Sequence, residues 1–277
     1  MTKINHTNLQ YMPEQGIAGK FVDTAFDGDG ILAGIRFHHE NTFNFAFDIV
    51  DAIAEKTPDK HAMLHISNNK EEKIFTFGDI SRRSSQTAHY FKSLGIKKGD
   101  KVMLVLKRHY QFWYAILALH KIGAIAIPAT NLLVKKDFVY RFNAADISAI
   151  VCTPDGNVSE YAQEAALECP QLKTKIIVGQ SKEGWHHFNE EFSQFPEVFN
   201  RPFGTEAACG DDPMLMFFTS GTTAYPKIAT HTYKYPLGHF ITAKYWHNVD
   251  PDGIHGTISV TGWGKALWGK LYGQWMC

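Results

Sequence analysis

The spacing of apolar residues changes several times along the chain, and each change marks an expected helix or strand. Apolar residues at helical spacing predict a helix over 42–56, which ends before Pro58. Two short runs, 62–66 and 73–77, are joined by polar residues and predict a hairpin. Residues 1–40 show no sustained period and are rich in Gly, Asp and Asn, so we expect them to form an N-terminal arm.

From Gly78 onward, helical and β-branched segments alternate. The pattern predicts helices over 79–94, 109–122, 135–145 and 159–168, and buried strands over 101–106, 124–128, 148–152 and 175–178. Gly95 and Gly123 follow the first two of these helices, as glycines at helix ends often do. This alternation is typical of parallel strands joined by crossover helices, so the expected fold class is α/β with a layered parallel sheet.

A mixed connecting segment over 180–212 separates these elements from the last part of the chain. The pattern then predicts a strand over 214–218, a helix over 231–246, a strand over 255–260 and a helix over 265–275. Pro236 and Gly238 lie near the start of the predicted helix over 231–246 and can break or bend it there.

The strand over 214–218 leads into a loop that combines hydroxyls, glycine and one lysine. The sequence over 217–227 is FFTSGTTAYPK. Four hydroxyls and the backbone N–H groups can donate hydrogen bonds, Gly221 allows close approach of an anion, and Lys227 adds a positive charge. A surface turn can have the same composition, but the preceding strand and the following Pro226-Lys227 favour phosphate binding. The Gly-x-x-x-x-Gly-Lys-Ser/Thr spacing of a P-loop is absent.

Composition narrows the classes of function. The 277 residues contain 28 Lys plus Arg and 28 Asp plus Glu, so the net charge is zero and no global field attracts nucleic acid. Neither the four cysteines nor the 14 histidines show the spacing of a metal site, and we expect none held by protein side chains. The most apolar stretch, 115–129, is interrupted by polar residues, so no membrane span is expected. Scattered cysteines and a polar N-terminus lead us to expect a cytoplasmic protein.

Each of the other candidate residues has both a functional and a structural interpretation. The pair Lys107-Arg108, after a predicted strand, either contacts an anion or is solvated. His231, four residues after Lys227, is more typical of packing than of catalysis, and the Gly-x-Ser-x-Gly elbow of serine hydrolases is absent. Trp263, between two glycines, either forms the wall of a cleft or packs in the core, and the residues alone favour neither.

The run TSGTTAYPK over 219–227 resembles the phosphate-binding signature of the adenylate-forming superfamily, which includes acyl-CoA synthetases, luciferases and the adenylation domains of peptide synthetases. Segments over 43–51, 101–108, 235–246 and 261–275 are similar to the medium-chain acyl-CoA synthetase branch. The resemblance begins near Asn41 and implies an AMP-binding large domain over 41–277. It also implies a two-step reaction, in which a carboxylic acid and MgATP give an acyl-adenylate and CoA then displaces AMP to form the thioester.

The same resemblance implies roles for individual residues and for the co-substrates. ATP, CoA and Mg²⁺ held through the phosphates are the expected cofactors, and the expected partner is a small carboxylic acid. Trp263 and Gly264 match the acyl pocket. The resemblance implies that Lys227 also acts in catalysis. The residues that would hold the ATP phosphates are Thr219, Ser220, Gly221, Thr222, Thr223 and Lys227.

The chain also departs from the pattern of this superfamily. Ala224 stands where the loop usually has glycine, and Val260 stands where an acidic residue usually precedes Thr-Gly-Trp. Members of the family are roughly twice as long, and the motifs for adenine, ribose and the C-terminal catalytic lysine are missing from these 277 residues. We therefore expect the N-terminal portion of an acyl-CoA synthetase that is inactive alone. The alternative is a non-catalytic nucleotide- or acyl-binding remnant.

Overall fold

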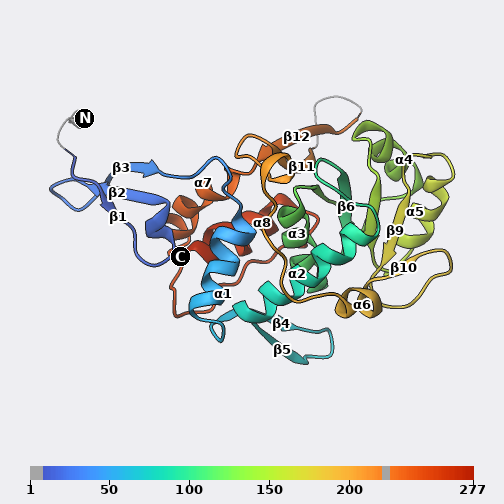
Figure 1. The fold of residues 1–277 in the computed structure, drawn as a ribbon, viewed down its shortest axis with the longest axis horizontal. Coiled ribbons are helices and arrows are strands. Elements are labelled where there is room, and N and C mark those ends of the chain that lie inside the picture. The colour runs from blue at the N-terminus through green and yellow to red at the C-terminus, as the bar shows by residue number, and fades with distance from the viewer. Residues whose placement is uncertain (1–8, 220–224) are drawn as a thin grey trace.

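The fold is built on a seven-stranded sheet with the strand order β10-β9-β8-β6-β7-β11-β12 (Figure 1). A computed structural model of the chain describes residues 9–219 and 225–277. Neighbouring strands are parallel except for the last pair, in which β12 runs antiparallel to β11. The expected α/β class is therefore confirmed. The strands are β6 (Lys101–Val105), β7 (Ile125–Pro128), β8 (Ala149–Cys152), β9 (Thr174–Ile177), β10 (His186–His187), β11 (Pro213–Thr219) and β12 (Lys227–Thr232).

Helices cover both faces of this sheet. Alternate residues of β6 point to opposite faces, so Val102 and Leu104 pack with α2 (Phe77–Ser93) and α3 (Gln111–Ile122). Met103 and Val105 pack with α4 (Lys135–Ala144) and α5 (Val158–Ala166) on the other face. Gly123 ends α3 with φ of 79°, the left-handed conformation that glycine adopts without steric cost.

The segments outside the sheet follow the sequence pattern in part. The predicted helix over 42–56 is a π-helix, Ala46–Asp51, that continues into α1 (Ala52–Lys56). The predicted hairpin is confirmed as β4 (His61–Ile66) paired with β5 (Glu72–Thr76). The connecting segment contains β10 and α6 (Phe188–Glu191), and β10 adds an edge strand beside β9.

The N-terminal segment contains regular structure that its sequence did not indicate. Residues 9–40 include a three-stranded antiparallel sheet of β1 (Met12–Pro13), β2 (Val22–Phe26) and β3 (Leu32–Phe37). The strands are short, and only β2 has several buried positions, which explains why no alternating period stands out. This small sheet lies at the end of the molecule farthest from α4 and α5 (Figure 1).

Two elements near the C-terminus differ from the prediction. Residues 227–232 form β12, and the helical segment begins only at α7 (Tyr235–Ile241), followed by a π-helix, Thr242–Trp246. The predicted strand over 255–260 is wrong, because these residues find no pairing strand in the described chain and Ile258 is 92% exposed. The predicted helix over 265–275 is divided at Leu271 into α8 (Gly264–Lys270) and α9 (Tyr272–Met276).

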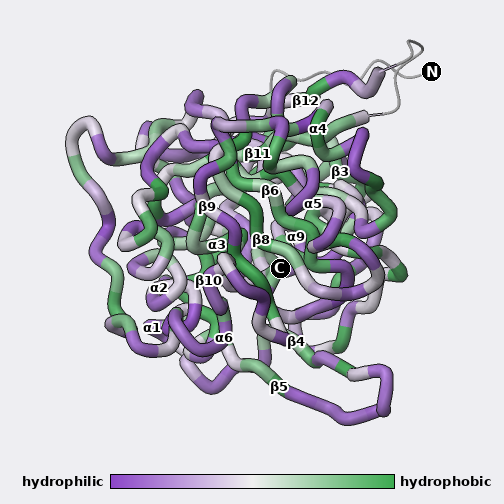
Figure 2. The backbone as a smooth tube through the Cα atoms, turned by 90° about the vertical axis from the view of Figure 1, so that its right-hand side faces the viewer, coloured by the Kyte–Doolittle hydropathy of each residue, from purple (hydrophilic) through white to green (hydrophobic). Residues whose placement is uncertain are grey.

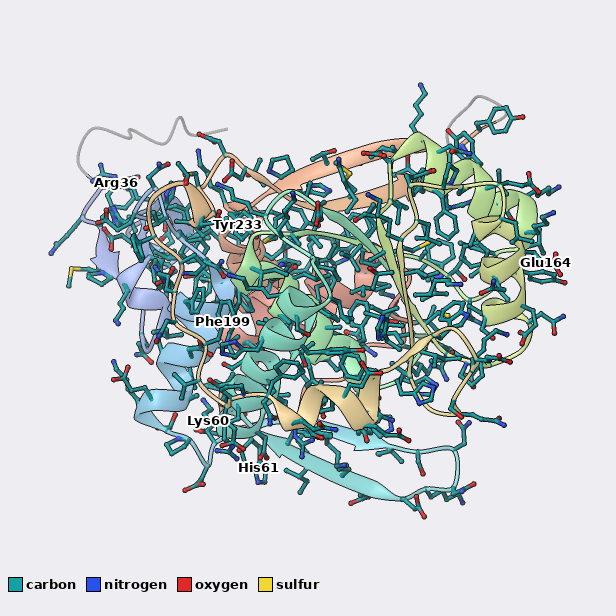
Figure 3. The ribbon with its side chains drawn as sticks, turned by 45° about the vertical axis from the view of Figure 1, so that its right-hand side comes forward. Arg36, Lys60, His61, Glu164, Phe199 and Tyr233 are labelled. Carbon is teal, nitrogen blue, oxygen red and sulfur yellow. The ribbon has the colours of Figure 1, made fainter. Side chains whose placement is uncertain are left out.

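The core lies around the central strands. In Figure 2 the tube is hydrophobic along β6 and β8 and hydrophilic at the tip of the β4–β5 hairpin. In Figure 3 Tyr233 lies inside the molecule and Glu164 lies on its outer surface, which agrees with their burial. No helix in the described ranges combines the length and hydropathy that a membrane span requires.

Candidate nucleotide site

The two ends of the expected phosphate loop are joined by strand pairing. Strand β11 ends at Thr219 and β12 begins at Lys227, and these two residues are partners in the antiparallel register. The Thr219 hydroxyl donates to the Lys227 carbonyl at 3.3 Å. Both residues are exposed. Ser220, Gly221, Thr222, Thr223 and Ala224 lie outside the described residues, so Thr219 and Lys227 are the predicted phosphate contacts that the geometry brings together.

Helix α4 contacts the residues on both sides of the loop. The Tyr140 hydroxyl donates to the Pro226 carbonyl at 2.8 Å, and its ring stacks on Tyr225 with 4.9 Å between the centroids. The Arg141 guanidinium lies 5.2 Å from the centroid of the Phe218 ring, within the range of a cation–π contact. These contacts fix where the chain leaves β11 and where it enters β12. Tyr140 was missed from the sequence because it lies 86 residues from Pro226.

The segment that carries Trp263 is attached to the carboxyl ends of β6 and β7. The Thr261 backbone N–H and hydroxyl both donate to the Lys107 carbonyl, at 3.0 and 2.5 Å. A Cβ on Gly262 would lie 2.4 Å from the carbonyl carbon of Ala129, so only glycine permits this approach. Ala129 directly follows β7, and β7 runs parallel to β11. Thr219 and Trp263 therefore belong to the same edge of the sheet, where such folds bind ligands.

Trp263 itself is a surface side chain. It is 61% exposed and precedes α8, so the alternative of a tryptophan packed in the core is excluded. A Cβ on Gly264 would lie 2.5 Å from the Trp268 ring, which explains the second glycine of the segment. The assignment of Trp263 and Gly264 to an acyl pocket stays a prediction.

The charged pair Lys107-Arg108 has a structural and an electrostatic effect. Lys107 adopts φ of 46°, and its carbonyl is the acceptor for Thr261. Burial lowers the pKa of Lys270, and the charge of Arg108 lowers this pKa further. Arg108 and Lys270 therefore bring positive charge close together near this segment, and an anion would relieve their repulsion.

His231 packs between aromatic rings on β12. Its ring lies 4.0 Å from that of Tyr235 and 5.8 Å from that of Phe217, and burial lowers its pKa. His239 on α7 stacks on Trp268, and burial, with a smaller effect of His231, lowers the pKa of His239 to about 4. Both imidazoles are neutral near pH 7, which agrees with the expected packing role of His231.

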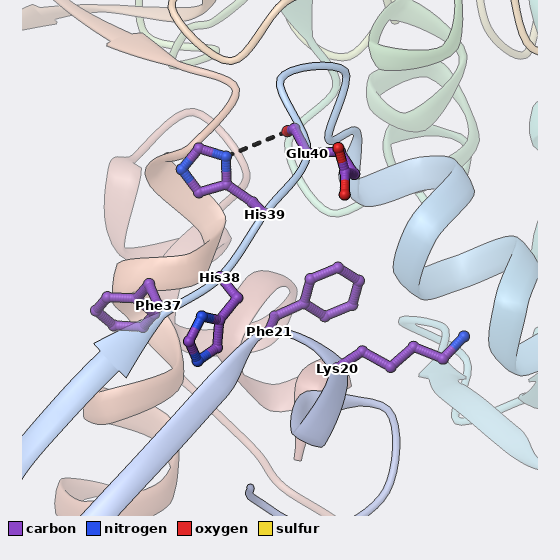
Figure 4. Close-up of a pocket in the computed structure, with 6 residues that line it drawn as sticks. All are labelled: Lys20, Phe21, Phe37, His38, His39 and Glu40. Atoms are coloured by element: carbon purple, nitrogen blue, oxygen red, sulfur yellow. Dashed lines mark hydrogen bonds between the residues drawn. The ribbon is translucent and has the colours of Figure 1, made fainter. Parts of the chain in front are cut away.

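The described residues contain no group of three or more His, Cys, Asp or Glu side chains arranged to hold a metal ion. A cavity of about 460 Å³ lies at the N-terminal sheet rather than at the edge with Thr219 (Figure 4). His38 bonds to Asp23 at 2.6 Å, and His39 bonds to the Glu40 carbonyl at 3.2 Å, so both cavity histidines already have partners. This cavity is open and lined mainly by exposed residues, and it adds nothing to the nucleotide site.

Comparison with known proteins defines the class. Residues 50–258 match the family model described as AMP-binding enzyme, and the chain belongs to this family. It is 32% identical over 243 residues to the human acyl-coenzyme A synthetase ACSM4, mitochondrial, which covers 85% of this chain and 41% of that protein. It is 31% identical over 245 residues to the human acyl-coenzyme A synthetase ACSM5, mitochondrial, and this match covers 84% of this chain and 40% of that protein. The chain thus spans about two fifths of the length of these relatives.

Solved structures show the same fold. An acyl-CoA synthetase from Brucella canis superposes with a TM-score of 0.73 at 21% identity, over 84% of this chain and 41% of that one. The anthranilate CoA ligase AuaEII in complex with anthranoyl-AMP superposes with a TM-score of 0.70 at 19% identity, over 86% of this chain and 44% of that one. The expected large-domain architecture of adenylate-forming enzymes is therefore confirmed for this chain.

The expectation of a cytoplasmic protein is contradicted. The relatives from human and rat are named as mitochondrial proteins, which points to the mitochondrion rather than the cytoplasm. The features behind the expectation were the scattered cysteines and a polar N-terminus, and neither distinguishes these two compartments because both keep most thiols reduced.

Proposed function

We propose that the chain is the N-terminal portion of an ATP-dependent acid–CoA ligase. This enzyme would activate a carboxylic acid, of medium chain length by the resemblance, as an acyl-adenylate and transfer the acyl group to CoA. Membership of the AMP-binding family and the names of the ACSM relatives support the reaction class. The observation that carries the proposal is the pairing of Thr219 with Lys227 at the ligand-binding edge of the sheet.

Lys227 is the residue to which the proposal gives the largest electrostatic effect. When a carboxylate attacks the α-phosphorus of ATP, negative charge accumulates on the departing pyrophosphate. A lysine ammonium and preorganised hydroxyl and N–H donors stabilise that charge. Lys227 begins β12, whose backbone is held by β11 and by the Tyr140 contact to Pro226, so its starting point is fixed. Ser220, Gly221, Thr222 and Thr223 would supply the remaining donors.

Magnesium would arrive with the nucleotide as MgATP. Thr219 and Lys227 offer one hydroxyl and one cation, and the described residues supply no cluster of carboxylates that would hold Mg²⁺ independently. The ion would be held through phosphate oxygens of ATP, where it would neutralise charge on the leaving pyrophosphate.

The acid would bind beside Trp263. An exposed indole offers an apolar surface for an acyl chain, and Gly262 and Gly264 keep the backbone close to Ala129 and to the Trp268 ring. The carboxylate of the acid would then lie toward Thr219, on the same edge of the sheet. CoA would accept the acyl group in the second step.

Calorimetric titration of the 277-residue chain with MgATP tests the proposal. We expect one-to-one binding that weakens when EDTA removes magnesium. Thr219→Val should weaken binding about three- to tenfold, because it removes one hydrogen-bonding hydroxyl. Thr230→Val is the matched control, since Thr230 is an exposed threonine on β12 away from the loop, and it should leave the affinity unchanged. No measurable binding of MgATP would contradict the assignment of Thr219 and Lys227 to the ATP phosphates.

Hydroxylamine trapping of an activated acid tests the second part. The chain with MgATP and octanoate should form no hydroxamate, because the residues that would bind adenine and ribose are not among these 277. Hydroxamate formation would contradict that expectation, although it would support the ligase reaction. Nucleotide binding without an effect of the acid on affinity would favour a non-catalytic nucleotide-binding protein.

A further inference from the structure

Lys227 lies between two peptide groups that are each held by a hydroxyl side chain. The Pro226 carbonyl, which belongs to the peptide group on its N-terminal side, accepts a hydrogen bond from the Tyr140 hydroxyl at 2.8 Å. The Lys227 carbonyl, in the peptide group on the other side, accepts one from the Thr219 hydroxyl at 3.3 Å. A peptide group is planar and turns as one unit, so each hydrogen bond restricts the rotation of its plane. Together the two bonds limit the directions in which the Lys227 side chain can leave the backbone.

The ring of Tyr140 is itself held by aromatic contacts to both sides of the loop. It stacks on Tyr225 with 4.9 Å between the centroids and an interplanar angle of 24°. It also forms an edge contact with Phe218 at 6.2 Å. Tyr225 directly precedes Pro226, and Phe218 directly precedes Thr219. Packing against these two rings therefore directs the Tyr140 hydroxyl at the Pro226 carbonyl.

Arg141, the next residue of α4, has contacts of a different kind. Its side chain is only 13% exposed, and its Nη1 donates to the Asp137 carbonyl at 3.1 Å, one turn earlier on α4. The guanidinium also lies 3.7 Å from the Asp137 carboxylate and over the Phe218 ring. The charge of Arg141 is thus engaged on its own helix, whereas Lys227 is exposed. Tyr140 is therefore the residue of α4 that holds the backbone of the exposed cation.

We infer that Tyr140 is a positioning residue for Lys227 in nucleotide binding. The role rests on the proposed function, in which Lys227 holds the ATP phosphates. The Tyr140 hydroxyl bonds to Pro226, so its effect reaches the phosphates only through Lys227. A lysine whose backbone is already fixed loses less conformational freedom when it binds, which increases the affinity. AMP lacks the β- and γ-phosphates, so Tyr140 should affect the binding of MgATP and not that of AMP.

Calorimetric titration of Tyr140→Phe with MgATP and with AMP tests this role. The variant keeps the ring contacts and removes the hydrogen bond to Pro226, so MgATP should bind about three- to tenfold more weakly and AMP as in the wild type. Tyr161→Phe is the matched control, because Tyr161 is a half-buried tyrosine on the neighbouring helix α5 whose hydroxyl accepts from Asn157 at 3.5 Å. It should change neither affinity. Equal weakening of MgATP and AMP in Tyr140→Phe, or no weakening of either, would overturn the role.

A double variant tests whether Tyr140 acts through Lys227. In a Lys227→Ala background, Tyr140→Phe should not weaken MgATP binding further, because the side chain that it positions is already absent. A further three- to tenfold loss, roughly that seen in the single variant, would overturn the inference, since Tyr140 would then act on the nucleotide without Lys227.

Amide hydrogen exchange of the unliganded chain gives a measurement that does not depend on the nucleotide. Tyr140→Phe should speed exchange over 227–229 about three- to tenfold and leave 230–232 unchanged, because only the Lys227 end of β12 loses a contact. Unchanged exchange over 227–229 would overturn the inference, whether or not the chain binds MgATP. Faster exchange there, with no MgATP binding by the wild type, would support the positioning of Lys227 and contradict its proposed contact with the phosphates.

Discussion

The contact between Gly262 and the end of β7 gives the sharpest structural prediction. An added Cβ would lie 2.4 Å from both the carbonyl carbon and the oxygen of Ala129, and 2.5 Å from the backbone nitrogen of Thr130. These are backbone atoms within the sheet edge, so the Gly262 segment must move instead. Movement breaks the two hydrogen bonds that Thr261 donates to Lys107.

The cost of Gly262→Ala follows from these contacts. Two lost hydrogen bonds at about 1 kcal/mol each give about 2 kcal/mol, within the range of about 1–3 kcal/mol for overpacking. Unfolding entropy of about 2.1 cal/mol/K per residue gives roughly 0.6 kcal/mol/K for a chain of 277 residues. The expected fall in Tm is therefore about 3 °C.

Differential scanning calorimetry of Gly262→Ala measures this fall directly. Gly256→Ala is the matched control, because it lies in the same segment and an added Cβ there has no atom within 4 Å. We expect the control to keep the wild-type Tm within about 1 °C, as surface substitutions usually do. Equal Tm values for the two variants would refute the close approach of Gly262 to β7.

Two further predictions concern buried ionisable groups. His120 is fully buried, and burial lowers its pKa from 6.5 to about 3, so the unfolded chain binds the extra proton and stability falls as pH falls below 6.5. Between pH 7 and pH 5 this effect lowers the free energy of unfolding of the wild type by about 2 kcal/mol. Urea titrations at the two pH values should therefore show a fall in His120→Gln that is smaller by about 2 kcal/mol than in the wild type. Equal falls in the two proteins would contradict His120 as the cause. The buried Lys121 ammonium bonds to Asp51 at 2.9 Å. In the same assay Asp51→Ala should lower the free energy of unfolding by about 3 kcal/mol, because it leaves the Lys121 charge buried and unpaired, and Lys121→Met should lower it clearly less. Equal losses in the two variants would contradict this cause.

The sequence predicts the parallel sheet well because its strands are buried on both faces. Strands such as β6 and β8 appear as continuous apolar runs, and α3, which follows β6, ends at Gly123. β12 was not predicted, because its residues are half-buried or exposed and show no buried apolar run. It forms a strand because it pairs with β11. The segment 255–260 has the composition of a strand, but composition cannot supply a neighbouring strand.

The candidate site is likewise predictable from the sequence only in part. The motif predicts Thr219 and Lys227 as phosphate contacts because their spacing is local. The contacts that fix their surroundings, Tyr140 with Pro226 and Thr261 with Lys107, join residues 86 and 154 positions apart. No local pattern encodes such distances, and they arise only when α4, β6 and β7 are assembled around one sheet.

The most direct test of the central claim compares ATP with AMP in binding to wild type and Lys227→Ala. If Lys227 holds the β- and γ-phosphates, its loss removes a charge-assisted contact that AMP never makes. Calorimetry should show MgATP binding weakened about ten- to a hundredfold in Lys227→Ala and AMP binding unchanged. Lys173→Ala, at an exposed lysine before β9, should change neither affinity. Equal effects of Lys227→Ala on ATP and AMP, or no effect on either, would contradict the account.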